Sequence, residues 1–380
     1  MAGIYIHIPF CKKRCIYCDF FSDTRMHLRK DYVDALCREL DMADEELEKS
    51  TVHTLNRGEG MTSTPSQLSG EELVRIFDAL SLHLPLSACK EITLEANPDD
   101  LKADYITMLK HTPINRISMG IQSFDDDDLL FLNRRHTAAQ AEEAFIRCRE
   151  AGFENISIDL IYGLPGQTIQ GWQSNLRRAT ALRPAHISAY SLIYEEGTAL
   201  FRMLESGKVS ECDDELSLDM FDCLIDTLEA AGYEHYEISN FALPGMYSQH
   251  NTSYWLDVPY LGLGPSAHSY DGKCRRWNIK DISGYMNKIS HGSNAYETEI
   301  LDTNSRYNDM ILTSLRTMWG LSLRCIEENF GRDMREYCQA LAKPYIDTGK
   351  LVLSGDNLKL TRSGLFVSDS IMSDLMKVED

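Results

Sequence analysis

Short hydrophobic runs alternate with longer amphipathic segments along the first half of the chain. EITLEA (91–96) and RISMGIQS (116–123) have the β-branched apolar content of buried strands, whereas TAAQAEEAFIRCREAG (137–152) has apolar residues at helical spacing. The pattern predicts strands at 3–8, 51–55, 91–96, 116–123, 155–163 and 186–193, and helices at 29–48, 69–83, 99–110, 137–152, 168–182 and 211–231. Such repeated βα units indicate an α/β fold in which parallel strands form a partial (β/α)6 barrel of the TIM type, covered by helices.

Residues that are unusual for a protein core come in, or just after, successive predicted strands. They are Cys11, Gly58, Gly60, Glu95, Gln122 and Asp159. Each could be a paired structural polar group, but ligands of such folds gather where the carboxyl ends of the strands meet. We therefore expect these residues to share one site.

The second half of the chain has a different character. Residues 241–300 are rich in aromatic residues, glycine and proline, and we expect them to connect a barrel at 1–240 with a smaller domain at 301–380. That domain is predicted to contain helices at 304–318, 322–330, 333–348 and 363–376, with a hairpin that turns at 355–357. Helices with one small hairpin are typical of a winged-helix-like α+β domain.

Composition narrows the function classes. The chain of 380 residues carries a formal net charge of −20, which disfavours nucleic acid and anionic membrane surfaces as partners. No apolar run approaches the roughly 18 residues of a membrane span, and the N-terminus MAGIYIHIPF lacks a signal-peptide pattern. We expect a soluble cytoplasmic protein, in which the cysteines outside the opening cluster, among 11 in all, are buried small hydrophobic residues.

Three of these cysteines stand apart from the others. Cys11, Cys15 and Cys18 are spaced C-x3-C-x2-C directly after the first predicted strand. Three thiolates on one loop can bind three irons of a [4Fe–4S] cluster and leave the fourth iron open. Structural zinc is the alternative, but it prefers four protein ligands, and no second CxxC or HxxxH pair is present in the sequence.

The cysteine motif, with Tyr17 before its last member, resembles that of the radical S-adenosylmethionine (SAM) superfamily. YIHIPFCKKRCIYCDF, LEANPDDL, RISMGIQSFDDDDLLFLNRRH, IDLIYGLPGQT and HNTSYW are similar to the subfamily that contains oxygen-independent coproporphyrinogen III dehydrogenase and a heme chaperone. The resemblance implies a partial (β/α)6 barrel. It also implies that the three cysteines bind a [4Fe–4S] cluster and that SAM chelates the open iron, so that electron transfer yields a 5′-deoxyadenosyl radical.

The resemblance also implies which residues contact SAM. Tyr5, Tyr17 and Glu95 correspond to contacts of the SAM on the cluster. Gln122, Arg134 and Asp159 match positions that hold a second SAM in the dehydrogenase, and Ile193 and His268 align to adenosyl-contacting positions there, although their residue types differ. Glu95 corresponds to the acid that binds the methionyl ammonium. Gly58, Gly60 and Thr64 correspond to a glycine-rich loop that approaches the methionyl carboxylate, but Glu59 interrupts this loop and three extra residues lengthen it.

Two functions remain within the subfamily. The dehydrogenase has a further Cys where this chain has Phe20 and a longer N-terminal extension, whereas His250-Asn251-x-x-Tyr254-Trp255 matches the HNxxYW motif of the heme chaperone. We therefore expect a heme-binding protein that passes heme to an acceptor hemoprotein and takes electrons for its cluster from a donor. Because neutral imidazole is a good axial ligand of heme iron, His250 is the first candidate for that role and His268 the second.

Overall fold

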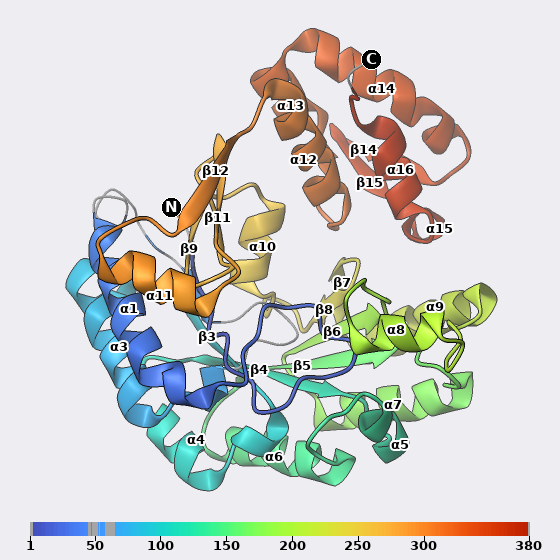
Figure 1. Ribbon diagram of the computed structural model, residues 1–380. Helices are drawn as coiled ribbons and strands as arrows, with labels where there is room; N and C mark the ends of the chain where they lie inside the picture. The colour runs from blue at the N-terminus through green and yellow to red at the C-terminus, as the bar shows by residue number, and fades with distance from the viewer. Residues whose placement is uncertain (1–2, 45–46, 48–51, 53, 58–64, 379–380) are drawn as a thin grey trace.

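The computed structural model describes residues 3–44, 47, 52, 54–57 and 65–378. Its centre is a run of six parallel strands, β1 (Gly3–Ile6), β2 (Thr54–Arg57), β3 (Glu91–Ala96), β4 (Arg116–Gln122), β5 (Asn155–Tyr162) and β6 (His186–Ser191). They neighbour one another in sequence order, as in the predicted (β/α)6 fold, and curve into a partial barrel (Figure 1). The second strand begins at Thr54, later than the predicted 51–55.

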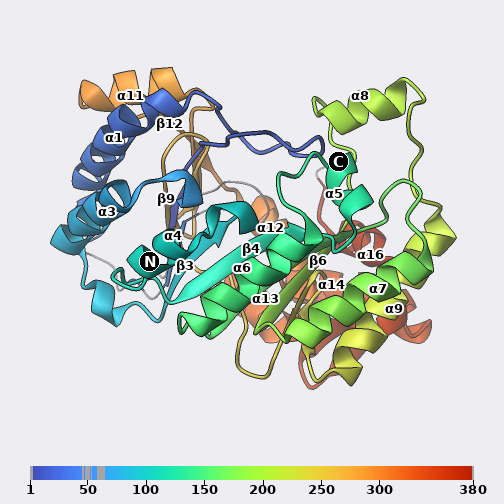
Figure 2. The same ribbon diagram turned by 90° about the horizontal axis from the view of Figure 1, so that it is seen from below.

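Helices cover the outer side of this curved sheet (Figure 2). They are α1 (Arg29–Met42), α3 (Gly70–His83), α4 (Ala103–Leu109), α6 (Ala138–Glu150), α7 (Ile169–Leu182) and α9 (Asp214–Ala230), with the shorter α5 (Asp126–Phe131) and α8 (Ala199–Glu205). Short 3-10 turns lie at Met26–Leu28, Pro65–Gln67, Leu86–Ala88 and Pro98–Asp100. The start of α3 shows how local chemistry sets a boundary, since Ser69 and Glu72 form a reciprocal capping box.

Strand alternation gives the sheet two different faces. In β3, Ile92 and Leu94 belong to the apolar core, whereas Glu91 and Glu95 alternate with them and are also buried. Because successive residues of a strand point to opposite faces, the apolar side chains pack under the helices and the carboxylates line the barrel interior. The interior is therefore polar, which suits a ligand site better than a structural core.

The sheet is twice as wide as the sequence predicts, with 12 strands in the described part of the chain. Antiparallel β8 (Asn240–Ala242) and β7 (Glu234–Glu237) extend it beyond β6, and β9 (Tyr260–Leu263), β10 (His268–Tyr270), β11 (Cys274–Asn278) and β12 (Tyr296–Ile300) extend it beyond β1. Residues 241–300, predicted to connect two domains, supply four of these strands, β9 to β12, and the end of β8, together with α10 (Gln249–Trp255) and α11 (Ile282–Ser290). These strands are short and partly polar, so the hydrophobic pattern of the sequence does not predict them.

The C-terminal region has its own core and a three-stranded sheet of β13 (Leu321–Ser322), β15 (Asn357–Leu360) and β14 (Leu351–Ser354). Its helices are α12 (Thr303–Leu315), α13 (Leu323–Phe330), α14 (Arg332–Asp347), α15 (Arg362–Leu365) and α16 (Ser368–Leu375). Backbone hydrogen bonds from Ile238 N–H to the Arg316 carbonyl and from Met318 N–H to the Tyr236 carbonyl join it to the barrel. Phe366 also packs edge-on against Phe221 of α9.

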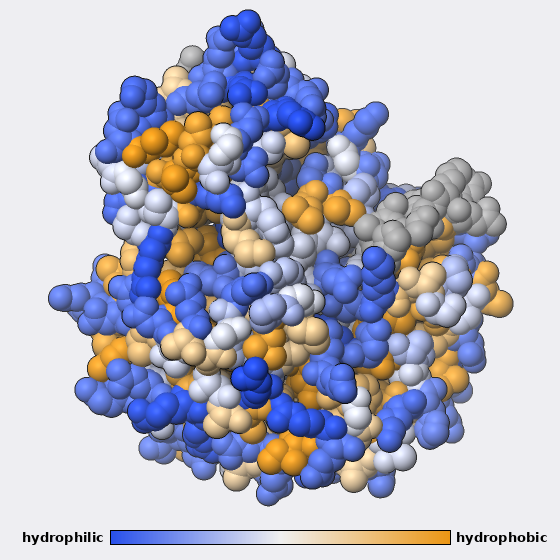
Figure 3. Space-filling view, turned by 180° about the vertical axis from the view of Figure 1, so that it is seen from behind, coloured by the Kyte–Doolittle hydropathy of each residue, from blue (hydrophilic) through white to orange (hydrophobic). Residues whose placement is uncertain are grey.

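Hydrophilic side chains cover most of the face opposite to the view of Figure 1, with small apolar patches between them (Figure 3). This surface agrees with the formal net charge of −20. In the described part of the chain, every helix is too short or too polar to span a bilayer.

Candidate iron–sulfur and SAM site

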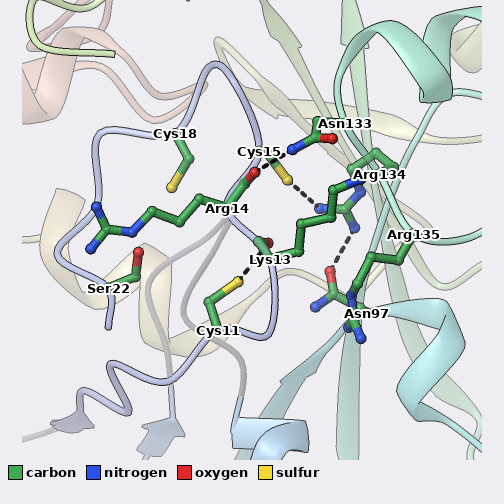
Figure 4. Close-up of a pocket in the computed structure, with 10 residues that line it drawn as sticks. All are labelled: Cys11, Lys13, Arg14, Cys15, Cys18, Ser22, Asn97, Asn133, Arg134 and Arg135. Carbon is green, nitrogen blue, oxygen red and sulfur yellow. Dashed lines mark hydrogen bonds between the residues drawn. The ribbon is translucent and has the colours of Figure 1, made fainter. Parts of the chain in front are cut away.

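The three clustered cysteines lie on the loop that follows β1, at the carboxyl end of the barrel strands. Cys11, Cys15 and Cys18 are each partly exposed and line one pocket (Figure 4). The pocket is completed by Lys13, Arg14 and Ser22 from the same loop, Asn97 after β3, and Asn133, Arg134 and Arg135 after α5. The topology thus brings segments about a hundred residues apart in sequence to the loop with the thiols, and of the residues predicted to share a site this pocket contains Cys11.

Each thiol has its own surroundings in this structure. Cys15 Sγ accepts a hydrogen bond from Arg134 Nη1 at 3.3 Å, and Cys11 Sγ donates to the Lys13 carbonyl at 2.9 Å. Across the described ranges, no three Cys, His, Asp or Glu side chains gather closely enough to ligate one metal ion. The three thiols share a pocket without converging on one point.

Positive charge dominates this pocket in a protein that is otherwise acidic. Arg135 is paired with Asp99 and Asp100 at 2.8 Å, while the Lys13 and Arg14 side chains are exposed at the rim. Burial raises the pKa of the Cys11 thiol, and the nearby Arg135 and Arg134 act in the opposite direction. Cationic donors around partly exposed thiols suit an anionic iron–sulfur cluster, so the residues fit the group that the motif implies.

The buried side chain of Gln122 indicates a place for a polar ligand in the barrel interior. Its side chain is fully buried, yet among the residues that the structure describes neither its amide oxygen nor its amide nitrogen has a hydrogen-bond partner. Its backbone φ is 72°, a left-handed conformation that is uncommon for residues other than glycine. An unpaired buried amide costs about 1–3 kcal/mol, and backbone strain of this kind clusters at ligand sites.

The barrel interior below the pocket contains the predicted acidic residues. Glu95 and Asp159 are both buried, and burial raises the pKa of Asp159 to about 6, an effect that Ser188, Arg116 and Arg134 counteract. Asp159 lies on β5, directly opposite Gly120 of β4, while Glu95 of β3 lies opposite Ser118. Both carboxylates therefore face the same interior as Gln122.

Tyr5 and Tyr17 are buried beside the cysteine loop. The Tyr5 hydroxyl is 2.7 Å from His7 Nδ1, and His7 Nε2 is 2.8 Å from the Phe21 carbonyl. Because a carbonyl only accepts, Nε2 carries the His7 proton and Nδ1 accepts from Tyr5; burial, moreover, lowers the pKa of His7 to about 4. This series of hydrogen bonds connects β1 to the loop that carries the thiols.

Other predicted site residues are placed differently. Gly58, Gly60 and Thr64 lie outside the described residues. Ile193 follows β6 and is 64% exposed. The sequence does not single out Asn97 and Arg135, although Asn97 lies within the LEANPDDL motif. Asn97 Oδ1 accepts a hydrogen bond from Arg134 Nη2 at 2.7 Å.

His250, the first candidate for the heme ligand, lies inside the fold in this ligand-free structure, and its role stays a prediction. His250 has no solvent exposure, and its Nδ1 and Nε2 are hydrogen-bonded to Thr54 Oγ1 at 3.1 Å and to the Tyr254 hydroxyl at 2.7 Å. Burial and Arg116 lower its pKa to about 3, so the imidazole is neutral but both nitrogens are engaged. The burial of His250 follows from its contacts with Thr54 of β2 and with Tyr254.

Comparisons with known proteins agree with this architecture. Residues 5–179 match the radical SAM superfamily model, and residues 301–367 match that of the HemN C-terminal domain. The chain is 34% identical over 374 residues to the heme chaperone HemW of Bacillus subtilis, which covers 98% of both chains. It is 35% identical to HemW of Lactococcus lactis, over 86% of this chain and 84% of the relative.

A solved structure shows the same fold. The coproporphyrinogen III oxidase HemN of Escherichia coli superposes with a TM-score of 0.86 at 24% identity, over 99% of this chain and 90% of that one. The Bacillus subtilis relative, at 34% identity, is closer to this chain in sequence than that solved structure, at 24%. The chain therefore belongs to the heme chaperone HemW family of radical SAM proteins.

Proposed function

We propose that the protein is a heme chaperone that binds heme and transfers it to an acceptor hemoprotein in the cytoplasm. The observation that carries the proposal is the match, along 98% of both chains, to a relative named for heme chaperone activity. The residue at position 20 supports it, because phenylalanine stands where the dehydrogenase pattern has a further cysteine.

The proposal includes a [4Fe–4S] cluster held by Cys11, Cys15 and Cys18. Such a cluster supplies electron transfer and an open coordination position for SAM. We assign the SAM on the cluster to Tyr5, Tyr17 and Glu95, together with the loop that contains Gly58, Gly60 and Thr64. Gln122, Arg134 and Asp159 lie at positions that hold a second SAM in the dehydrogenase, and we assign a SAM contact to them on the same basis. The unpaired amide of Gln122 supports this assignment, since a polar ligand would satisfy it.

The second candidate function is oxidative decarboxylation of coproporphyrinogen III. The likeness in fold to HemN favours it, but at 24% identity that likeness speaks for the fold alone. Both candidates place a tetrapyrrole on the protein, so binding of a tetrapyrrole by itself does not separate them.

A paired experiment separates the two functions. We expect anaerobically reconstituted protein, given heme, to convert an apo-hemoprotein to its holo form, as followed in the Soret region. With SAM and a reductant, the same protein should leave coproporphyrinogen III unchanged. Formation of the divinyl product at a rate above that of a Cys15→Ser control would contradict the chaperone proposal.

A further inference from the structure

Asp100 connects the loop of the three cysteines to the barrel. It ends the 3-10 turn Pro98–Asp100, which follows β3, and its side chain is only 3% exposed. One carboxylate oxygen, Oδ1, accepts a hydrogen bond from Lys12 Nζ at 2.9 Å, and Lys12 lies between Cys11 and Cys15 in the sequence. A buried carboxylate therefore holds the loop at a position inside the cysteine motif itself.

The other oxygen of the same carboxylate binds two further segments. Oδ2 accepts from Arg135 Nη2 at 2.8 Å and from Ser66 Oγ at 3.2 Å, and it also accepts from the Gln67 side-chain amide. Ser66 and Gln67 are both buried and belong to the 3-10 turn Pro65–Gln67. One carboxylate thus joins three segments that lie far apart in sequence.

The turn Pro65–Gln67 directly follows the loop that the resemblance assigns to SAM. That loop contains Gly58, Gly60 and Thr64, and Pro65 is the next residue of the chain. The turn at the end of this loop is therefore bonded to the same carboxylate that holds the cysteine loop.

The charges around Asp100 are balanced. Lys12 and Arg135 bring two positive charges, and Asp99, which pairs with Arg135 at 2.8 Å, brings a second negative charge. Hydrogen bonds between ionised partners are about twice as strong as neutral ones, so these contacts hold the segments firmly. Because the Lys12 side chain is 52% exposed, the buried carboxylate is the rigid half of that pair.

Asp100 acts on the site from a second layer. Among the described residues that line the pocket of the thiols are Asn97 and Arg135, but not Asp100 (Figure 4). Residues that fix the ligands of a metal site from behind commonly determine its affinity, although they never touch the metal. The contacts of Asp100 with Lys12 and Arg135 place it in that position.

We propose, on the basis of the cluster and SAM site proposed above, that Asp100 is a positioning residue that couples the two parts of this site. It sets the cysteine loop relative to the turn Pro65–Gln67. Binding of the cluster and binding of SAM therefore both depend on one buried carboxylate.

The test measures SAM binding to the anaerobically reconstituted full-length protein. Isothermal titration gives the affinity, and electron paramagnetic resonance of the reduced cluster gives the spectral change that SAM causes. Asparagine has one acceptor oxygen instead of two, so Asp100→Asn cannot accept from Lys12 and from the turn together. This variant should bind SAM about tenfold more weakly, show a smaller spectral change at equal SAM concentration and lose iron to a chelator faster.

Asp99→Asn is the matched control. Asp99 is the adjacent residue, carries the same charge and also pairs with Arg135, but the hydrogen bonds from Lys12 and from the turn go to Asp100. The control should keep the wild-type SAM affinity and spectrum. Equal losses in both variants would overturn the proposal, because they would trace the effect to Arg135 or to charge alone.

Lys12→Met separates positioning from charge. It removes an exposed ammonium and leaves the contacts of Asp100 with the turn in place, so the protein should fold normally. Alone, the substitution should weaken SAM binding severalfold. Combined with Asp100→Asn it should add nothing, because the partner of Lys12 is already lost. An effect of Lys12→Met of equal size in both backgrounds would refute the coupling, and if Asp100→Asn does not fold, wild-type SAM affinity in Lys12→Met refutes it.

These measurements distinguish the role of Asp100 from the function of the protein. Heme is absent from them, so wild-type SAM affinity in Asp100→Asn would overturn the coupling and leave the heme chaperone function standing. If the wild-type protein took up no cluster, or if its cluster gave no response to SAM, the cluster and SAM site proposed above would fail, and the role of Asp100 with it.

Discussion

Arg134 donates one guanidinium hydrogen bond to Cys15 Sγ at 3.3 Å and others to Asn97 Oδ1 at 2.7 Å and the Gly120 carbonyl at 2.5 Å. One side chain thus ties the cysteine loop to the carboxyl ends of β3 and β4. A cationic donor to a thiolate stabilises negative charge. Since reduction adds negative charge to an iron–sulfur cluster, Arg134 should raise the cluster's reduction potential.

Replacement of Arg134 by glutamine should therefore make the cluster harder to reduce. We expect a more negative midpoint potential, measured by an anaerobic redox titration followed by electron paramagnetic resonance, and faster loss of iron to a chelator. Arg135→Gln separates the hydrogen bond from the charge, because Arg135 also acts on the Cys11 thiol but is paired with Asp99 and Asp100. It should shift the potential less than Arg134→Gln does. Equal potentials for wild type and Arg134→Gln would refute the role assigned to this hydrogen bond.

Gln122→Leu should stabilise the ligand-free protein and weaken SAM binding. Leucine removes a buried amide that has no partners, which should add about 1–3 kcal/mol to the free energy of unfolding. Denaturant unfolding measures the first effect, and isothermal titration with SAM measures the second.

Gln167→Leu is the matched control for that prediction. Gln167 is also buried, but its Oε1 accepts from Gly163 N–H at 2.9 Å and its Nε2 donates to Asp128 at 3.3 Å. The same substitution there should destabilise the protein, because it strands the Gly163 N–H. Destabilisation of Gln122→Leu to the same extent would mean that the Gln122 amide is satisfied by protein groups.

The sequence predicts the parallel strands well and their antiparallel extensions poorly, for a physical reason. EITLEA at 91–96 forms β3 with the predicted bounds, because its apolar residues alternate with polar ones at the strand period and include the β-branched Ile92 beside Thr93. CRRWN at 274–278 forms β11, but its alternating, half-exposed residues resemble a loop.

The same limit applies to the candidate site. A cysteine spacing is local, so the position of the three thiols on one loop follows from the sequence. The burial of His250 depends on Thr54, which is 196 residues away, and the engagement of Arg134 depends on Asn97, 37 residues away. Neither pairing leaves a periodic signal, so the sequence could name these histidine and arginine side chains but not their partners.

Asp159 should make the cluster-free protein less stable as the pH rises from about 4 to about 6. Its pKa is raised to about 6 in the folded state, whereas an unfolded aspartate titrates near 3.9. Between these values the folded state binds more protons, so stability falls with rising pH and the penalty stays constant above pH 6. Asp159→Asn should remove this penalty and raise the free energy of unfolding by up to about 3 kcal/mol at pH 8.

Denaturant unfolding at pH 4.5, 6 and 8 measures this dependence. Glu237→Gln provides a comparison, because burial raises the pKa of Glu237 to about 7 despite Arg316 and Asn240. The destabilisation that ionisation of Glu237 causes in the wild-type protein should grow up to about pH 7, whereas the effect of Asp159 ends near pH 6. A constant difference between wild type and Asp159→Asn over the whole range would rule out titration of Asp159 as the cause.

Gly262 allows the backbones of β9 and β10 to approach closely, and Gly262→Ala should push these strands apart. A Cβ atom at this position would lie 1.9 Å from the His268 carbonyl oxygen, a backbone atom that cannot turn aside. The strands must separate, which we expect to lower the free energy of unfolding by about 3 kcal/mol, measured by denaturant unfolding. Gly171→Ala in α7 is the control, because its nearest neighbour, Thr168 Oγ1, would be at an ordinary 3.4 Å. The control should retain its stability, and an equally stable Gly262→Ala protein would show that β9 and β10 are not held at this distance in solution.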